Sequence, residues 1–443
     1  MSFVIDKQTL DDLNLTGKFR QGSVFSLFNQ VHTRGGERLL ETMFQLPLTD
    51  HEKINERSSL FAYFQQMQLD FPLEGKHLQD AENYLNTDSA ANRVMATAGN
   101  VIKKIQGQAL KDERYELLRS GFAAAVFILK TSKDFFNRLE TRDNPFNRQI
   151  KRANAILNQA KLDWISHNID AGSLAIFTLS KYDHLLRHAL KTEMESLMEI
   201  IYELDVYIAV GKVASANNYS YAKAHPAGKN LFKAEELRHL LLKKAVGNDL
   251  SLNQDSNLFF LTGANMAGKS TLMKTVGISF YLAHAGFPVA AKSMEFSVKK
   301  GLYTSINTPD NLSMGYSHFY AEVMRVKKVA EDVAAGHGLM VIFDELFKGT
   351  NVKDAYDATL AVTDAFAEYQ NCFFIISTHI IEVGEALKGK RSNLQFKYLP
   401  TILEGNIPRY TYRLTNGITN DRQGMMIIEN EGVLDLLNGA DAN

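Results

Sequence analysis

The sequence predicts an α/β domain with a mostly parallel sheet, preceded by a domain made only of helices. Across the 443-residue chain, apolar residues recur with helical spacing from about residue 36 to 245, where prolines are few. After residue 245, short apolar runs alternate with helical segments, and the clearest runs are 258–261, 339–343 and 372–377. This alternation is typical of a parallel sheet covered by helices. A third observation is the glycine-rich loop that directly follows the first run.

The clearest helical pattern in the first half runs from Ser173 to about Asn217. Its stripe recurs at steps of three and four residues, and all members but the last are apolar: Leu186, Leu190, Met194, Leu197, Ile201 and Asp205. One helix over this range would extend roughly 60 Å at about 1.5 Å per residue and would act as a lever or spacer. Periodicity equally allows two shorter helices of an ordinary bundle.

Charge and composition name no function by themselves. Lys plus Arg (49) nearly balances Asp plus Glu (50), so a nucleic-acid surface would require local segregation of charge. The single cysteine, Cys372, excludes an internal disulfide and a cysteine-based zinc site. No apolar segment approaches the length that spans a bilayer, and Met1–Asp6 does not resemble a signal peptide. We therefore expect a cytoplasmic protein without a membrane partner.

The glycine-rich loop, Gly263–Ser270, matches the pattern G-x-x-x-x-G-K-[ST] at every fixed position. In such a loop the backbone amides cradle the phosphates, and the following helix N-terminus adds positive potential. We expect Lys269 to reach the β- and γ-phosphates and Ser270 to hold Mg²⁺. The residues expected to bind the nucleotide are Gly263, Ala264, Asn265, Met266, Ala267, Gly268, Lys269, Ser270 and Thr271.

Polar residues also follow the two later strands. Asp344 and Glu345 end the run Leu339–Phe343, which is typical of a Walker B element. Asp344 is then expected to hold Mg²⁺, and Glu345 to polarise the attacking water as the catalytic base. His379 ends the third run and is predicted to sense the γ-phosphate at the carboxyl edge of the sheet.

A polar, glycine-containing segment, Asp310–Phe319, leads into a predicted helix between the loop and the carboxylates. A helix N-terminus with free amides and the hydroxyl of Ser317 is suited to a second anion contact. Taken alone, the segment is simply typical of a capped helix.

Together these motifs resemble the MutS family of DNA mismatch-repair ATPases, whose nucleotide domain is related to ABC-type ATPases. Thr262–Thr271 follows the family's TG-x-NM-x-GKST loop, and Asp344–Thr350 follows its DE-x-x-x-GT element. Thr378–His379 matches the family's TH switch. The family's helix entry, D-x-L-x-x-G-x-S-x-F-x-x-E, is matched without a gap by Asp310, Leu312, Gly315, Ser317, Phe319 and Glu322.

The resemblance extends over nearly the whole chain. Val31–Asp50 is similar to the start of the family's helical core, Leu204–Val206 to the end of its lever helix, and His225–Pro226 to the entry of its ATPase domain. We therefore expect a lead-in segment at 1–35, a helical core and lever domain at 36–245, and an ATPase domain with a short helical tail at 246–443.

The resemblance also implies roles and partners. It implies ATP and Mg²⁺ as cofactors, with Lys269 as phosphate ligand, Ser270 and Asp344 as metal ligands, Glu345 as base and His379 as sensor. Ser317 would contact the nucleotide across a homodimer interface, because each site in the family is completed by the partner's helix. We expect no room in this chain for the family's mismatch-reading domain, and we expect the clamp domain that grips the DNA backbone to be reduced or missing. The DNA partner would therefore be recognised by its structure.

One departure concerns the base of the nucleotide. Relatives usually place an aromatic residue where this sequence has Ala245, within Lys244–Asp249. Losing a stacking partner costs on the order of 1 kcal/mol of base affinity. We therefore expect weaker or less base-selective nucleotide binding.

The leading functional hypothesis is a Mg²⁺-dependent ATPase that couples hydrolysis to dimer and lever motion on mismatched, branched or distorted DNA. A second hypothesis is a mechanical ATPase that acts on RNA, ribosomes or a protein partner, because the net charge is near neutral. A third is a nucleotide-gated dimerisation module without useful turnover.

Overall fold

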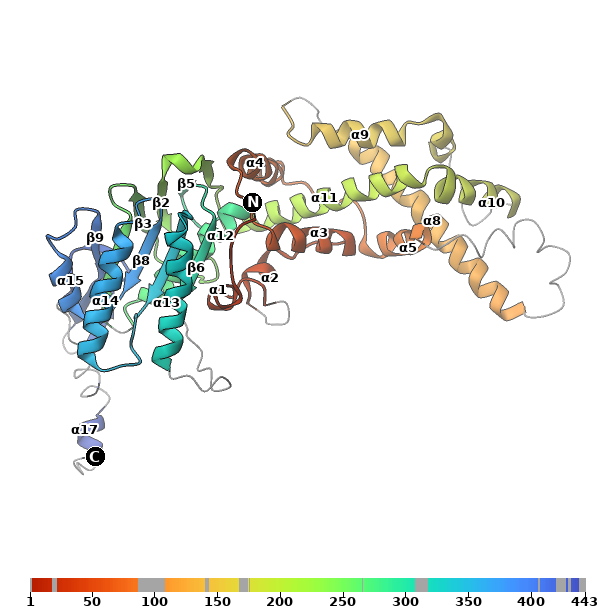
Figure 1. The fold of residues 1–443 in the computed structure, drawn as a ribbon. Helices are drawn as coiled ribbons and strands as arrows, with labels where there is room; N and C mark the ends of the chain where they lie inside the picture. Colours follow the sequence, from red (N-terminus) through yellow and green to blue (C-terminus); the bar gives the residue numbers. More distant parts are fainter. Residues whose placement is uncertain are drawn as a thin grey trace. The chain divides into compact units, whose positions relative to one another are not determined.

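The computed structural model describes residues 2–17, 22–86, 108–139, 143–166, 174, 176–264, 266–306, 318–404, 407–419, 428 and 432–437. The chain divides into two compact units, whose elements are labelled in Figure 1. The α/β unit comprises Met1–Phe28, Met43–Ser59 and Ala214–Asn443, and the helical unit comprises Asn29–Thr42 and Leu60–Val213. All strands of the described residues belong to the α/β unit.

Helices alone make up the described part of the helical unit. They are α3 (Arg34–Gln45), α4 (His51–Met67), α5 (Gly75–Asn86), α8 (Gln108–Arg138), α9 (Asn147–Leu157), η1 (Ala160–Ser166), α10 (Ile176–His184), η2 (Leu185–Ala189) and α11 (Lys191–Ala216). The boundary between the units falls within α3, α4 and α11. The described residues of this part of the chain therefore form helices, as the sequence predicts.

The long helical pattern near residues 173–217 forms two α-helices, α10 and α11, joined by the π-helical turn η2. The wider π-turn is an interruption that periodicity does not signal. Within it Arg187 is buried, and its Nε lies 2.9 Å from Oδ1 of Asp183. The hydroxyl of Tyr84 donates to the same carboxylate oxygen at 2.9 Å. The second of the two alternatives, two shorter helices, therefore describes this segment.

The polar end of that stripe, Asp205, has a structural role inside the helical unit. Its side chain is fully buried and accepts hydrogen bonds from the backbone amides of His32 and Thr33, the latter at 2.8 Å. The hydroxyl of Thr33 in turn accepts from the amide of Gly36 at 2.8 Å. These bonds satisfy amides at the start of α3, which explains a carboxylate on an otherwise apolar stripe.

A six-stranded sheet forms the centre of the α/β unit, in the order β12–β9–β4–β8–β7–β6. The strands are β4 (Leu258–Gly263), β6 (Gly301–Ser305), β7 (Leu339–Asp344), β8 (Phe373–Ser377), β9 (Leu394–Leu399) and β12 (Thr415–Asn416). All neighbours pair in parallel except β12, which runs antiparallel to β9. The three apolar runs singled out in the sequence are thus adjacent central strands, and their residues are buried.

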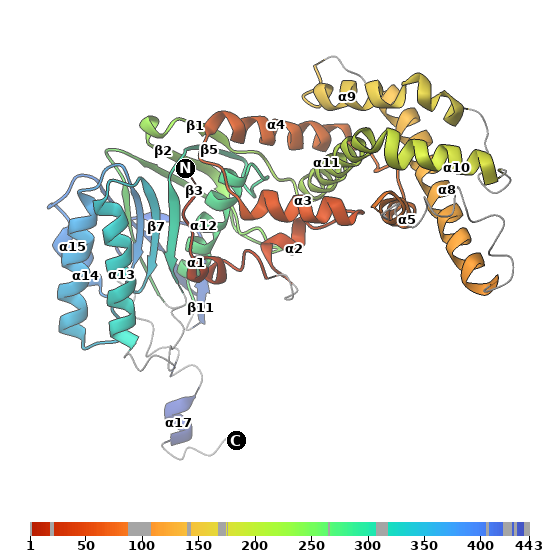
Figure 2. The same ribbon diagram turned by 45° about the vertical axis from the view of Figure 1, so that its right-hand side comes forward.

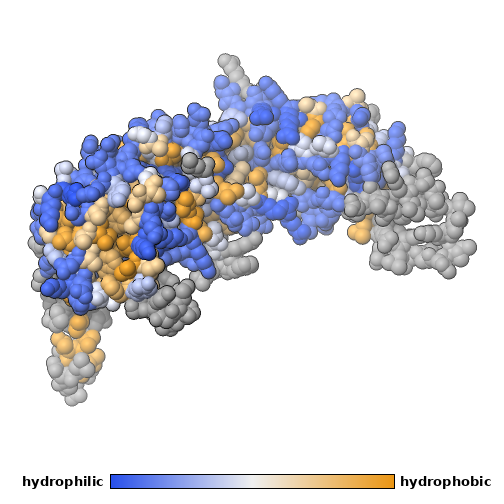
Figure 3. Space-filling view, in the orientation of Figure 1, coloured by the Kyte–Doolittle hydropathy of each residue, from blue (hydrophilic) through white to orange (hydrophobic). Residues whose placement is uncertain are grey.

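Helices cover both faces of this sheet. On one face, α13 (His318–Ala334), α14 (Val352–Ala367) and α15 (Ile381–Leu387) bury Val329, Phe366 and Val383 against the strands. The helix α12 (Lys269–Ala285) contacts β4, β6 and β7 from the other face (Figure 2). Apolar side chains also remain exposed over α13 and α14, as Figure 3 shows. Large exposed ones include Tyr320, Met324 and Val352.

A second sheet, in the order β1–β5–β2–β3, packs against α12 through β1. Its strands are β1 (Lys223–His225), β2 (Leu231–Leu237), β3 (Asn248–Asn253) and β5 (Ser293–Ser297). The expected domain boundary at 245/246 stays a prediction. The strands β1 and β2 lie before this position in the sequence, and both pair with β5, which lies after it. Tertiary pairing of distant segments therefore extends the α/β unit toward the N-terminus.

Smaller elements complete the α/β unit. They are α1 (Lys7–Asp12), α2 (Val24–Phe28), η3 (Ala227–Lys229), the hairpin of β10 (Thr401–Glu404) and β11 (Ile407–Tyr410), and α17 (Val433–Leu437). In the part of the chain that the structure describes, no helix is long and apolar enough to cross a bilayer.

Candidate functional site

The glycine-rich loop connects the buried strand β4 to α12 at the carboxyl edge of the parallel sheet. Gly268 precedes α12 with φ of 100°, a left-handed conformation that favours glycine. The loop residue Met266 is also left-handed, with φ of 67°, and its side chain is 72 % exposed. Since no side chain caps α12, its first amides are left to face a ligand. Asn265 lies outside the described residues.

Lys269 begins α12 and is almost completely buried. Its Nζ donates to the carbonyl oxygens of Gly263 at 2.9 Å and Ala264 at 3.1 Å. Burial lowers the pKa of Lys269, while the carboxylates of Asp344 and Glu345 act in the opposite direction. The ammonium group is therefore held inside the loop by carbonyl groups, within the region where phosphate oxygens are expected.

Asp344 accepts two hydroxyl hydrogen bonds at the end of β7. Ser270 Oγ donates to Oδ2 and Ser377 Oγ donates to Oδ1, both at 2.5 Å. Asp344 and Ser377 are also paired in the register of β7 and β8, so the two strand ends are level. The structure thus brings together the two residues predicted to hold the metal, Ser270 and Asp344.

The oxygen set at this point fits a hard divalent cation. Mg²⁺ prefers oxygen ligands and is commonly held by one or two protein oxygens, with water and substrate phosphates completing the octahedron. A serine hydroxyl and an adjacent carboxylate supply those two oxygens. Within the described residues there is no cluster of three His, Cys, Asp or Glu side chains that would hold a metal by itself. The donor set therefore fits a metal bound together with phosphate.

Glu345 and His379 form a pair beside the metal ligands. His379 Nε2 lies 2.6 Å from Glu345 Oε1. The hydrogen bond from His379 lowers the pKa of Glu345 against the opposing effect of burial, and the charges of His379, Lys348 and Lys269 add to the lowering. Glu345 also adopts φ of 56°, which is uncommon for a non-glycine residue and is found at functional sites. The pair presents an ionised carboxylate at the sheet edge.

Of the remaining predicted site residues, Ala267 and Thr271 line a cavity next to the loop, while Ser317 lies outside the described residues. The helix α13 that Ser317 was predicted to enter begins at His318. The second anion contact at Ser317 therefore stays a prediction.

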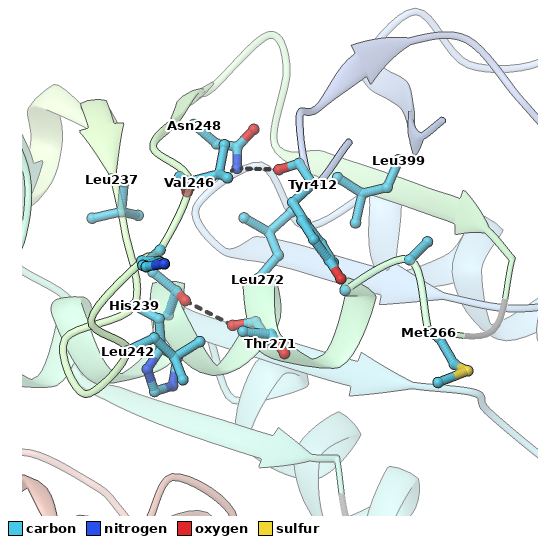
Figure 4. A pocket seen from close by; sticks show the side chains of 15 residues that line it. Leu237, His239, Leu242, Val246, Asn248, Met266, Thr271, Leu272, Leu399 and Tyr412 are labelled. Carbon is cyan, nitrogen blue, oxygen red and sulfur yellow. Dashed lines mark hydrogen bonds between the residues drawn. The ribbon is translucent and has the colours of Figure 1, made fainter. Parts of the chain in front are cut away.

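A cavity of about 330 Å³ adjoins the loop and the first turn of α12 (Figure 4). Its lining comes from the β2–β3 connection, the loop, α12 and the segment after β11, and includes Leu237, His239, Ala245, Asn248, Met266, Gly268, Thr271, Leu272 and Tyr412. Asn248 ties two of these segments together, because its Nδ2 donates to the carbonyl oxygen of Tyr412 at 2.9 Å. The cavity is apolar with a few polar groups, as small-molecule sites usually are.

Tyr412 and Ser377 are the residues that the sequence analysis missed. Tyr412 brings an aromatic ring to the same cavity as Ala245 and lies close to Gly268, where an added Cβ would be 3.1 Å from the ring. No local pattern singled it out, because it follows a hairpin near the C-terminal end of the chain. Ser377 was visible only as the last residue of a strand. Position 245 lacks an aromatic ring, but Tyr412 supplies one to the same cavity from another segment.

Comparison with known protein families places two matches along the chain. MutS domain III matches residues 8–211 and MutS domain V matches residues 259–438. The "DNA mismatch repair protein MutS" of Alkaliphilus metalliredigens (strain QYMF) is 27 % identical over 249 residues, which cover 55 % of this chain and 28 % of that protein. That of Petrotoga mobilis (strain DSM 10674 / SJ95) is 28 % identical over 258 residues, 56 % of this chain and 30 % of its own length. The matches span less than a third of these curated relatives.

Proposed function

The chain belongs to the MutS family, and we propose that it is a Mg²⁺-dependent ATPase that acts on DNA as a homodimer. The observation that carries the catalytic part is the constellation at the carboxyl edge of the sheet. A buried lysine, a serine–aspartate pair and a glutamate–histidine pair converge there from β4, β7 and β8. Such an arrangement supplies a candidate phosphate-binding cation, candidate metal ligands and a candidate base, which are parts that phosphoryl transfer from a nucleotide uses.

The geometry supports a role for each of these residues. Lys269 exchanges its two carbonyl partners for phosphate oxygens of ATP. Ser270 and Asp344 would hold Mg²⁺, whose positive charge would stabilise the negative charge of the phosphates. Glu345 accepts a proton from the attacking water, and His379 keeps that carboxylate ionised and oriented. Ser377 fixes Asp344 by occupying its other oxygen.

Exposed apolar side chains support the dimer. Tyr320 and Met324 lie one turn apart on α13, and they are 44 % and 43 % exposed. In the sequence Ser317 directly precedes this helix, and the resemblance implies that Ser317 contacts the nucleotide across the dimer, so a contact on α13 supports the proposed homodimer. Val352, at the start of α14, adds a third side chain that is 77 % exposed. Apolar exposure of this kind is typical of a protein–protein contact.

The test of the catalytic part is ATP binding and turnover in two variants. Lys269→Ala should lose both, whereas Glu345→Gln should still bind ATP and lose turnover by about 10²-fold or more. Lys233→Ala is a matched control, because Lys233 is exposed on β2 and pairs with Glu235 at 3.4 Å. Turnover that persists in both active-site variants would contradict the proposal.

The dimer and the DNA partner need separate measurements. Glu345→Gln with ATP should dimerise in light scattering, and adding Tyr320→Lys with Met324→Lys should keep it monomeric. DNA affinity should be measured at low salt, where phosphate contacts are strongest, with duplex, branched and single-stranded DNA. Capture of ribosomes rather than DNA by Glu345→Gln would favour the alternative, a mechanical ATPase on RNA or a protein partner. Dimerisation without measurable hydrolysis in the unsubstituted protein would favour a nucleotide-gated module.

A further inference from the structure

The helix α9 carries a concentration of positive charge in a chain that is otherwise balanced. Residues 145–162 contain four basic residues and no acidic one, although Lys plus Arg (49) and Asp plus Glu (50) nearly cancel over the whole chain. Three of the basic residues, Arg148, Lys151 and Arg152, lie at steps of three and four. They therefore share one face of α9 and lie within about 6 Å along its axis.

This cationic face, formed by Arg148, Lys151 and Arg152, is exposed to solvent. In the described ranges of the chain none of the three makes an ion pair, whereas many other exposed cations do. Lys191 lies 3.8 Å from Glu195, for example. Arg152 lowers the pKa of Glu203, but burial raises it more and no ion pair forms between them. The cations are therefore available to an external anion.

The positive charges also lie near the N-terminus of α9, where the helix dipole favours acidic residues. The first turn of α9 has no acidic residue, and Phe146 at its N-cap provides no side-chain hydrogen bond. The helix dipole disfavours a cation such as Arg148 in the first turn. A position that breaks a local rule without a compensating contact points to a functional requirement.

The opposite side of α9 is buried in the helical unit, and this favours a nucleic acid over a membrane as the partner of the cationic face. Ile150, Ala153, Ile156 and Leu157 are buried. Phe146 anchors the start of the helix, with its ring 5.5 Å from that of Phe64 in α4 and 5.8 Å from that of Tyr207 in α11. A helix that binds a membrane surface needs a free apolar face, and α9 has none.

We propose that the cationic face of α9 binds the sugar-phosphate backbone of duplex DNA. The inference rests on the DNA part of the proposed function and assigns a surface to it. Duplex DNA carries one negative charge per about 1.7 Å of its axis, so three cations within about 6 Å meet several phosphates. Ala155 is exposed one turn further along and has a small side chain, which lets the backbone approach the helix closely. Contacts of this kind position DNA without reading its sequence.

The test is the salt dependence of DNA binding by a triple variant, Arg148→Gln with Lys151→Gln and Arg152→Gln. A matched control removes three cations of the helical unit that already pair with acids: Arg119→Gln, Lys191→Gln and Lys212→Gln. Fluorescence anisotropy with a duplex of random sequence gives the affinity between about 50 and 200 mM salt. ATP turnover without DNA and far-ultraviolet circular dichroism check that each variant is folded.

We expect the α9 variant to bind duplex roughly tenfold more weakly or worse at low salt, and its slope of log affinity against log salt to fall by about 2 to 3. The control should keep the slope of the unsubstituted protein. Equal slopes in both variants overturn the assignment of α9 and leave the proposed DNA function standing. Absence of duplex binding by the unsubstituted protein overturns both. The same titrations with a double-stranded RNA of equal length test the occupant, and a loss of affinity for the RNA alone overturns DNA as the occupant.

Discussion

Asp6 and Arg325 form an ion pair across 319 residues of sequence, and it ties the N-terminal segment to α13. Arg325 Nη2 also donates to Asp6 Oδ1 at 3.2 Å and to the hydroxyl of Thr9 at 3.1 Å. The same hydroxyl accepts from the amide of Thr304 in β6 at 3.0 Å. The segment before α1 therefore belongs structurally to the α/β unit, where Val4 forms a parallel bridge with Gly301 at the free side of β6.

Asp6→Asn should weaken this attachment in a pH-dependent way. Burial raises the pKa of Asp6, but the hydrogen bonds and charge of Arg325, with bonds from Thr9, outweigh it and bring the pKa to about 2. Because the folded-state pKa lies below the unfolded one, the stabilisation is complete above about pH 4 and is lost as the pH falls toward 2. At pH 7 it is worth about 2 kcal/mol.

Amide hydrogen exchange at Thr304 and Ile306 reports this locally, since both amides donate to the N-terminal segment. Protection should fall in Asp6→Asn at pH 7 and should converge with that of the unsubstituted protein near pH 2. Asp11→Asn is the control, because Asp11 is exposed on the same helix. Equal protection of both variants at pH 7 would show that the ion pair does not hold the segment.

His379→Ala should move the acid limb of the pH–rate profile to higher pH. Glu345 acts as a base only when ionised, and the hydrogen bond from His379 is the main cause of its lowered pKa. Removing that bond leaves burial, which raises the pKa, so activity is lost at a higher pH than before. The measurement is ATP turnover under saturating nucleotide from pH 4 to 8. An unchanged acid limb would contradict the assigned base, and His32→Ala, in the helical unit, is the control.

Tyr412→Ala should weaken ATP binding about fivefold, which corresponds to about 1 kcal/mol of lost stacking. Tyr412→Phe should retain the affinity, because it keeps the aromatic ring that lines the cavity and removes only the hydroxyl. Ala245→Phe should strengthen binding, since it places a second ring in the same cavity. Titration with ATP and GTP measures both affinity and selectivity. An alanine variant that binds both nucleotides as the unsubstituted protein does would remove Tyr412 from the site.

Arg57→Ala should loosen the C-terminal end of α12, the helix that follows the glycine-rich loop. Arg57 Nη1 donates to the carbonyl oxygen of Ala285 at 2.8 Å, and its side chain packs on Gly286, which has φ of 75°. A cation that binds the last carbonyls stabilises a helix, so we expect a loss of about 1 to 2 kcal/mol. Exchange of the Gly286 and Phe287 amides is the readout. Lys53→Ala, exposed on the same helix α4, should have no effect.

Much of the candidate site could be predicted because its signals are local. The spacing of Gly263, Gly268 and Lys269 is typical of a phosphate-binding loop, and parallel strands bring Asp344 and His379 to the same edge. The interruption between α10 and α11 could not be predicted. Arg187 within it makes a buried contact with Asp183 and Tyr84, and Tyr84 lies about a hundred residues away in the chain, so local periodicity does not report the contact.

The sequence by itself determined the motifs of the candidate site, the family and the division into a helical part and an α/β part, because each depends on residues close together in the sequence. Only the tertiary structure decided that Tyr412 faces the cavity of Ala245, that Asp6 holds α13, and that the cations of α9 face solvent. Such relationships arise when distant segments pack together to bury their apolar faces. This packing then determines where the polar side chains on the opposite face of each segment lie. The spacing of residues along one segment carries no information about which distant segment packs against it.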